Sequence, residues 1–216
     1  MTTLTGQQIV DENLAGWAYL LRGLQTRIAT PDFATGLSLV GAIGSAAAEL
    51  DHHPSIDLRA GHVNVRVSSR DSDGVGEVDV RLARAVTAAA TAAGLGTSAT
   101  AVSRLELALD TPDRATLLPF WAAALGLDPV GTGTDQEIQD RADALPTVWF
   151  QPSGRDEPRQ RWHPDVWVDP AQVQPRIDAA IAAGGRLVSD AEAPAFWVLA
   201  DPEGNQVCLC TWQSRG

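Results

Sequence analysis

Residues 49–71 read ELDHHPSIDLRAGHVNVRVSSRD and hold three of the four histidines in the chain. The adjacent pair His52 and His53 follows an alanine-rich apolar segment and precedes Pro54. Histidine suits the carbonyl end of a helix, and proline stops a helix, so the pair can simply mark a helix terminus. Histidine also exchanges protons near neutral pH, so the same pair can form an acid/base site. The residues alone leave both interpretations open.

The segments around this stretch indicate an α+β layer. The run HVNVRVSS alternates apolar and polar residues, which predicts a half-buried strand. Helical periods run through PDFATGLSLVGAIGSAAAEL, with Asp32 able to cap its start, and through VDVRLARAVTAAATAAGL. Thr5 and Gln8 form a capping-box pattern that predicts a further helix through Leu21, and a short strand is expected around residues 24–30.

The second half of the chain repeats one pattern. A strand-like segment precedes a helical one at RLELALD (104–110) with TPDRATLLPFWAAALGL, and again at WHPDVWVD (162–169) with PAQVQPRIDAAIAAGG. Further strand-like segments follow as TVWFQP in the first copy, and as FWVLAD and QVCLCTW in the second. This predicts a duplicated βαβββ unit whose paired sheets form a cup. The glycine-containing segment GLGTSATAVS, residues 94–103, reads as a linker, so we expect two domains, 1–97 and 102–216.

The composition excludes several kinds of partner. A formal net charge of −11 disfavours nucleic acid and an anionic membrane surface. The sequence lacks an apolar run long enough to span a bilayer and a signal-peptide pattern at its start, so we expect a cytoplasmic protein. Cys208 and Cys210 share one face of a predicted strand, a poor geometry for a disulfide, and are expected to be small core residues.

The first half resembles the pterin-4a-carbinolamine dehydratases across residues 4–95. The resemblance is carried by Gly16-Trp17, PDFATG, ELDHHPSIDL, HVNVRVSSRD and DGVGEVDVRLA. It implies removal of water from a 4a-hydroxytetrahydropterin without a cofactor. The matching site residues are His52, His53 and Asp79 as catalytic groups, with Arg70 and Asp71 contacting substrate.

This sequence departs from that family at three positions. Arg70 stands where the family has its third histidine, and Ala60 replaces an aromatic residue. Ala48 stands where the family has an acidic residue, with Glu49 one step out of register. Arginine does not give up its proton at neutral pH and cannot replace an acid/base histidine. His62 lies roughly 26 Å along the strand from Arg70, too far to substitute. The departures predict a weakened or inactive dehydratase.

The second half resembles the glyoxalase-like, or vicinal-oxygen-chelate, superfamily across residues 102–214. The segments LDTPDRATLLPFWAAALGL, VWFQP, WHPDVWVD and ADPEGNQVCLC carry this resemblance. The superfamily's metal-ligand positions hold Arg104, His163 and Cys208, which are too few ligands, so no metal is expected. The expected cup-lining residues are Arg104, Glu106, Trp149, His163, Asp165, Trp167 and Cys208. Six of the seven tryptophans lie in this half. They can pack in the core, or they can wall a site for a small uncharged or cationic organic molecule.

Three functions therefore stay open. The protein can be a weakened pterin dehydratase, or a non-enzymatic protein that captures an organic ligand in the second domain. It can also be an interaction protein whose first domain forms an oligomer. A homo-oligomer is expected, together with a small-molecule ligand, which is a pterin in the first domain and an unknown organic compound in the second.

Overall fold

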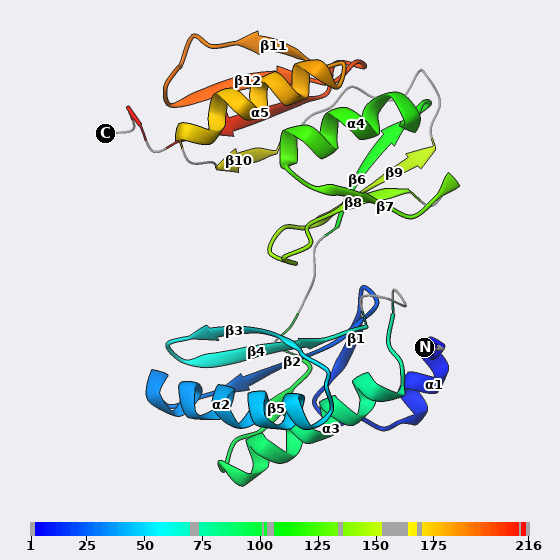
Figure 1. Ribbon diagram of the computed structural model, residues 1–216, viewed down its shortest axis with the longest axis vertical. Coiled ribbons are helices and arrows are strands. Elements are labelled where there is room, and N and C mark those ends of the chain that lie inside the picture. The colour runs from blue at the N-terminus through cyan, green and yellow to red at the C-terminus, as the bar shows by residue number, and fades with distance from the viewer. Residues whose placement is uncertain are drawn as a thin grey trace. The chain divides into compact units, whose positions relative to one another are not determined.

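The computed structural model describes residues 3–69, 74–100, 102, 106–133, 136–152, 164–167, 170–211 and 213–214. The chain divides into two compact units, Met1–Arg104 and Leu105–Gly216. Figure 1 shows their elements in chain order. Each unit combines helices with a sheet, so the α+β class expected from the sequence is confirmed.

The first unit is one antiparallel sheet with two long helices on one face. Its strands are β1 (Ala18–Leu20), β2 (Gly23–Ala29), β3 (Ser55–Arg59), β4 (His62–Val67) and β5 (Thr97–Ser98). The order is β1-β2-β4-β3, and β5 pairs with Arg27 and Ile28 of β2, after the residues of β2 that pair with β1. The helices α2 (Phe33–Glu49) and α3 (Glu77–Ala92) pack against this sheet, and the short helix α1 (Gly6–Asp11) precedes it.

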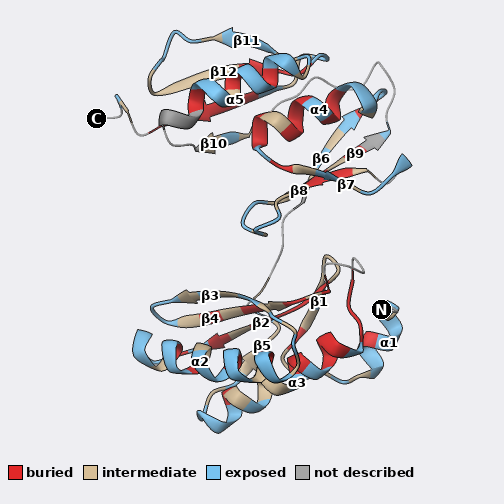
Figure 2. Cartoon of the chain, in the orientation of Figure 1, coloured by how far each residue is buried: buried red, intermediate tan, exposed pale blue. Residues whose placement is uncertain are grey.

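The core of the first unit follows from the alternation in β4. Val63, Val65 and Val67 are at most 2% exposed and pack with Ile43 of α2 and Leu82 of α3. The intervening residues of β4 face away from the helices and are half-buried. Figure 2 shows the same division, with the buried residues of each helix turned toward the sheet. The strand and both long helices agree with the sequence expectation, and Asp32 caps α2 by accepting the Thr35 N–H at 2.7 Å.

Two local expectations need correction. The capping box at Thr5 and Gln8 is present, but its helix ends at Asp11 instead of Leu21. Asn13 then adopts a φ of 50° and Gly16 a φ of 79°, which turn the chain into β1. The segment expected to be a plain linker also contributes β5, because Thr97 and Ser98 pair with β2. This strand has only two residues, which is too short to show an apolar period.

The second unit contains two four-stranded sheets of the same design. In the first copy β6 (Glu106–Thr111), α4 (Arg114–Leu125), β7 (Asp128–Val130), β8 (Glu137–Gln139) and β9 (Thr147–Pro152) give the order β6-β9-β8-β7. In the second, β10 (Asp165–Trp167), α5 (Pro170–Ala182), β11 (Arg186–Ser189), β12 (Phe196–Ala200) and β13 (Gln206–Cys210) give the order β10-β13-β12-β11. The first and last strands of each copy pair in parallel. The duplicated βαβββ unit expected from the sequence is therefore present.

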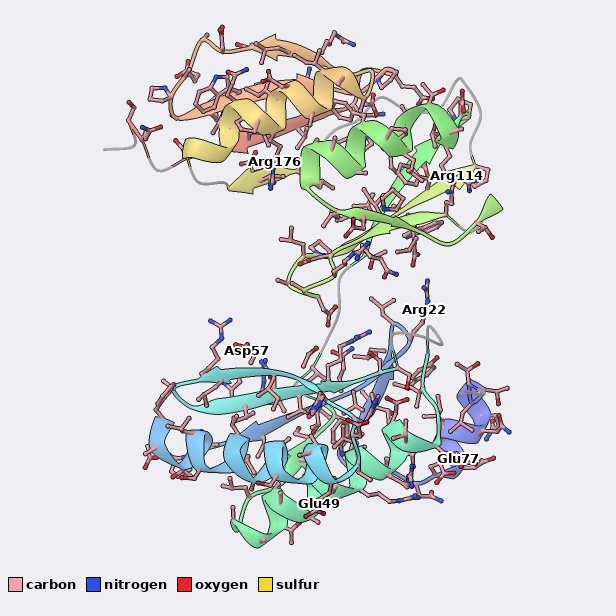
Figure 3. The ribbon with its side chains drawn as sticks, in the orientation of Figure 1. Arg22, Glu49, Asp57, Glu77, Arg114 and Arg176 are labelled. Carbon is pink, nitrogen blue, oxygen red and sulfur yellow. The ribbon has the colours of Figure 1, made fainter. Side chains whose placement is uncertain are left out.

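The two copies share one core. Phe120 of α4, Ile177 of α5, Phe150 of β9 and Leu209 of β13 are at most 4% exposed and belong to one cluster. Arg176 of α5, labelled in Figure 3, donates from Nη1 to the Leu125 carbonyl at the end of α4, at 3.3 Å. Burial lowers the pKa of this guanidinium from its usual value. We call the face of each sheet that is turned away from this core the cup face.

Candidate functional site

The histidine pair lies at the end of α2. This is the position expected if the pair marks a helix terminus. The helix stops after Glu49, and Asp51 takes a φ of 46°. The backbone N–H of His52 then returns to the Ala47 carbonyl at 3.1 Å. This closure fixes the direction in which His52 leaves the helix. The His52 side chain is 17% exposed, whereas His53 is exposed to solvent.

Asp79 supplies the fixed partner of His52. It lies in the first turn of α3 and is 0% exposed. The Nε2 atom of His52 lies 2.7 Å from Asp79 Oδ1. The other carboxylate oxygen, Oδ2, accepts the Ser69 hydroxyl at 2.7 Å and the Gly76 backbone N–H at 2.7 Å. Figure 3 labels Glu49 and Glu77, the last residue of α2 and the first of α3, which mark the two helices that build this site.

This arrangement decides which atom of His52 can exchange a proton. An ionised carboxylate only accepts hydrogen bonds, so the nitrogen facing Asp79 must carry hydrogen. In neutral imidazole one ring nitrogen donates and the other accepts, and the bond made by one sets the role of the other. With Asp79 as a carboxylate, this contact favours the His52 tautomer that carries its proton on Nε2, which leaves Nδ1 as the nitrogen that can accept a proton. A buried carboxylate also stabilises the imidazolium that forms when Nδ1 is protonated.

The other dehydratase residues inferred from the sequence are less well placed or fall outside the described part. Arg70 and Asp71 lie outside the described residues. Ala60, where the family has an aromatic residue, is exposed in the turn between β3 and β4. His62 begins β4 and pairs with Arg59, at the end of the strand opposite Ser69. Sequence reasoning gave Ser69 no role. Its signal was that the family resemblance sets a serine or threonine directly before the third histidine position, where this chain has Ser69.

Strand register places several of the expected cup residues. On the first sheet Trp149 pairs with Ala108 of β6 and Glu137 of β8, so the three share the cup face. Trp149 is half-buried, and Glu137 is 6% exposed. The amide of Gln139 donates to the Glu137 carboxylate at 2.5 Å. Glu137 did not stand out in the sequence, because one acidic residue in a short polar segment forms no repeating pattern that would assign it to a face.

On the second sheet, Asp165 pairs in register with Cys208, and Trp167 with Cys210. Asp165 is exposed, whereas Cys208 and Cys210 are 6% and 1% exposed free thiols. The register therefore places Asp165 beside Cys208.

The remaining expected cup residues are only partly visible. The backbones of Glu106 and Trp167 lie in β6 and β10, but their side chains are not among those described. Arg104 and His163 lie outside the described residues. Within the part of the chain that is described, no group of three or more His, Cys, Asp or Glu side chains is arranged to hold a metal ion. In the same part, no helix has the length and apolar character needed to cross a membrane.

Comparison with known proteins assigns a family to each unit. Residues 2–89 match the family described as pterin 4 alpha carbinolamine dehydratase, and residues 106–210 match the one described as a glyoxalase-like domain. A protein of Mycolicibacterium smegmatis named "Putative pterin-4-alpha-carbinolamine dehydratase" is 32% identical over 88 residues, which are 40% of this chain and 94% of that protein. A protein of Aquifex aeolicus with the same name is 31% identical over 75 residues, 35% of this chain and 76% of the relative.

A solved structure also resembles the first unit. It is described as a transcriptional coactivator/pterin dehydratase from Brucella melitensis, is 25% identical, and has a TM-score of 0.40 over 41% of this chain and 98% of its own. The sequence matches, together with the histidine pair at the end of α2, identify the first unit. The chain belongs, through its N-terminal unit, to the pterin-4a-carbinolamine dehydratase family, and this unit is fused to a glyoxalase-like domain.

Proposed function

We propose that the N-terminal unit is a weakened dehydratase of 4a-hydroxytetrahydropterins, in which His52 is the remaining acid/base group. The observation that carries this proposal is the 2.7 Å contact between His52 Nε2 and the fully buried carboxylate of Asp79. A histidine that only ended a helix would need no buried anion behind it. His53 and Asp79 complete the catalytic set that the family resemblance implies.

The reaction needs two proton transfers. The carbon–oxygen bond at C4a breaks, the hydroxyl leaves as water after accepting a proton, and the ring N–H loses its proton as the quinonoid dihydropterin forms. Nδ1 of His52 is suited to one of these transfers, because Asp79 stabilises the protonated ring and fixes its orientation. One positioned acid/base group contributes about 10²–10⁴-fold in rate. The loss of a histidine at position 70 therefore predicts a turnover lower by about that factor.

A dehydratase assay of the full chain tests this proposal. We expect low turnover in the wild type, its loss in His52→Gln, and a smaller effect in the matched variant His53→Gln, because His53 is exposed. Substrate binding should persist in His52→Gln, since glutamine keeps a polar side chain of similar reach. Turnover equal to that of intact family members, or turnover insensitive to His52→Gln, would overturn the proposal.

A second candidate function concerns the glyoxalase-like domain, which we propose binds a small organic molecule without a metal. The favouring observation is Glu137, a carboxylate 6% exposed on the cup face beside Trp149. An aromatic wall with a few polar groups is the usual composition of a ligand site. Asp165, Glu106 and Trp167 would add acceptors and a second aromatic surface. Arg104, His163 and Cys208 would line the site without chelating a metal.

Tryptophan fluorescence of the full chain measures this binding directly. Titration with a panel of uncharged and cationic aromatic compounds should quench the wild type and leave Trp149→Phe less affected. The matched variant Trp17→Phe, altered in the first unit, should still be quenched. A panel in which no compound changes the fluorescence would contradict this function.

We also propose that the chain forms a homo-oligomer through α2. Phe33 and Leu37 are 53% and 57% exposed on this helix, and the sequence has no charged residue between Asp32 and Glu49. A Cβ built on Gly41 or Gly44 would meet nothing within 4 Å, so the packing within the chain does not require these glycines.

Glycine inside a helix costs about 0.5–1 kcal/mol relative to alanine, and an approaching second copy would explain its presence. Light scattering should show an oligomer that Leu37→Glu dissociates and that the exposed-site control Arg81→Glu leaves intact. A monomeric wild type would exclude the proposed homo-oligomer.

A further inference from the structure

Among the described residues of the candidate site, Ser69 has a polar side chain to which neither the sequence nor the family resemblance gave a role. It follows β4 and is 7% exposed. Its hydroxyl donates to Asp79 Oδ2 at 2.7 Å, and its backbone N–H donates to the Gly74 carbonyl at 3.0 Å. Ser69 and Gly74 flank residues 70–73 in the sequence, and position 70 is where the family has its third histidine. Ser69 therefore touches both the partner of His52 and the ends of that segment.

We propose that Ser69 is a positioning residue for His52, acting through Asp79. This inference rests on the proposed function of the N-terminal unit and assigns a role within the same site. In this role Ser69 acts on Asp79 and not on the substrate. Its role is to hold the carboxylate so that Oδ1 faces His52 Nε2, which keeps the ring proton on Nε2 and leaves Nδ1 for proton transfer.

The hydrogen bonds of Asp79 provide the physical argument. Each carboxylate oxygen accepts about two hydrogen bonds in the carboxylate plane. Oδ2 is filled by the Ser69 hydroxyl and the Gly76 N–H, and Oδ1 faces His52. Two donors on Oδ2 restrain the rotation of the carboxylate. Without the Ser69 hydroxyl, Oδ2 would keep only the Gly76 N–H, and the orientation of the carboxylate toward His52 would be held less firmly. Because Asp79 is 0% exposed, water cannot readily replace a missing donor.

The alternative is that Ser69 only ties the ends of the segment together. Its backbone already does this through the bond to Gly74, and that bond does not need the side chain. The hydroxyl is therefore the part whose removal separates the two roles. A purely structural hydroxyl would change stability but leave the tautomer of His52 as it is.

Nitrogen-15 NMR of the His52 ring in the full chain measures the tautomer directly. At alkaline pH, where neutral imidazole dominates, the wild type should show a protonated Nε2 and an unprotonated Nδ1. Ser69→Ala should shift His52 toward a mixture of the two tautomers, and Ser69→Thr, which keeps the hydroxyl, should restore the wild-type pattern. The control Ser68→Ala alters the neighbouring serine, which accepts from Arg66 instead of contacting Asp79, and should change nothing.

An unchanged His52 tautomer in Ser69→Ala would overturn the proposal. If Ser69→Ala does not fold, Ser69→Cys keeps the volume with a weaker donor. It should then give an intermediate tautomer mixture, and a wild-type pattern in Ser69→Cys would equally contradict the role of Ser69.

Turnover distinguishes this inference from the function on which it rests. Ser69→Ala should lower kcat about tenfold, the effect of one hydrogen bond to a charged group, with KM unchanged. A shifted tautomer with no measurable dehydratase turnover in any variant, wild type included, would refute the proposed function and leave the positioning role standing. A normal tautomer with normal turnover in Ser69→Ala would refute the positioning role alone.

Discussion

At the scale of single residues, two positions decide the acid/base chemistry proposed for the first unit, His52 and residue 70. His52 has a buried carboxylate 2.7 Å away, while the family resemblance sets Arg70 at the position of an acid/base histidine. Arginine stays protonated throughout the range in which histidine titrates, so it can hold a negative group but cannot move a proton. Under the proposed function, a loss of dehydratase turnover therefore arises at position 70 and not at His52.

Restoring the family residues should recover activity. Arg70→His together with Ala60→Tyr should raise dehydratase turnover by about 10²-fold, because the change returns one acid/base group and one aromatic wall. The matched control Arg70→Gln with Ala60→Tyr removes the arginine without adding an acid or base. Equal turnover in the two double variants would show that the missing histidine does not limit the rate.

Asp201 is a second residue whose role is fixed by its contacts. It is 0% exposed and accepts the Trp121 indole N–H at 3.0 Å, the Asn205 side-chain amide at 2.7 Å and two backbone N–H groups. Asp201→Ala should lower the free energy of unfolding of the second unit by about 3 kcal/mol, since several buried donors lose their acceptor. Chemical denaturation followed by tryptophan fluorescence measures this. A loss no larger than that of the exposed-site control Glu192→Ala would contradict it.

At the level of single residues, the sequence singles out a residue only where a family motif contains it. It misses residues that only the geometry of the fold brings to the candidate site. His52 and Asp79 were found because both lie in segments that resemble one family. Ser69 and Glu137 were not found from the sequence. The importance of Ser69 comes from a contact across the fold, and that of Glu137 comes from the face of a short strand on which it lies. No pattern in the sequence reports that Ser69 faces a carboxylate ten residues later.

At the scale of elements, the two helices of the second unit support each other at their ends. Each carries a proline inside it, Pro119 in α4 and Pro175 in α5. The residue after each proline reaches a glycine at the end of the other helix. A Cβ on Gly185 would lie 2.0 Å from the Phe120 ring, and one on Gly126 would lie 2.8 Å from Arg176 Nη2. The glycines therefore leave room for the opposite side chain.

This reciprocal contact makes Gly185 intolerant of a side chain. Gly185→Ala should lower the free energy of unfolding by about 1–3 kcal/mol through overpacking against Phe120. The double variant Gly185→Ala with Phe120→Leu should recover part of that loss, because the smaller side chain vacates the space. Urea denaturation measures both. Gly185→Ala with wild-type stability would mean that the helices are not packed as described.

The N-terminus of α2 should make stability depend on acid pH. Hydrogen bonds from Thr35 lower the pKa of Asp32 below the ordinary value of 3.8. The carboxylate therefore stabilises the folded state fully above pH 3.8 and loses that effect as the pH falls through the lower pKa of the folded state. Asp32→Asn keeps a cap of similar strength without a charge, so its acid unfolding should be less steep below that pH. Identical acid unfolding curves would exclude this role for Asp32.

The elements that sequence could predict are the long periodic ones. The helices α2 and α3 and the strand β4 came from clear apolar spacing, and the repeated strand–helix pattern gave the duplication. The helix expected from Thr5 to Leu21 was wrong because an apolar run does not report the turn at Asn13 and Gly16. β1 and β5 have three and two residues, so each depends on pairing with β2 rather than on its own pattern.

At the scale of the whole molecule, the two units are suited to different chemistry. The dehydratase-like unit has a histidine with a buried carboxylate, which suits proton transfer on a ring such as a pterin. The glyoxalase-like unit has Trp149 beside the nearly buried Glu137, which suits binding without proton transfer. A pterin should therefore select the first unit, although both units are expected to take small organic ligands.

A crystal structure of the full chain soaked with 7,8-dihydrobiopterin, a stable relative of the reaction product, tests this central claim most directly. The account predicts that the pterin ring lies within hydrogen-bond distance of His52 Nδ1, with Nε2 still on Asp79. A pterin bound on the cup face beside Trp149, or His52 turned away from Asp79 with the ligand in place, would contradict it.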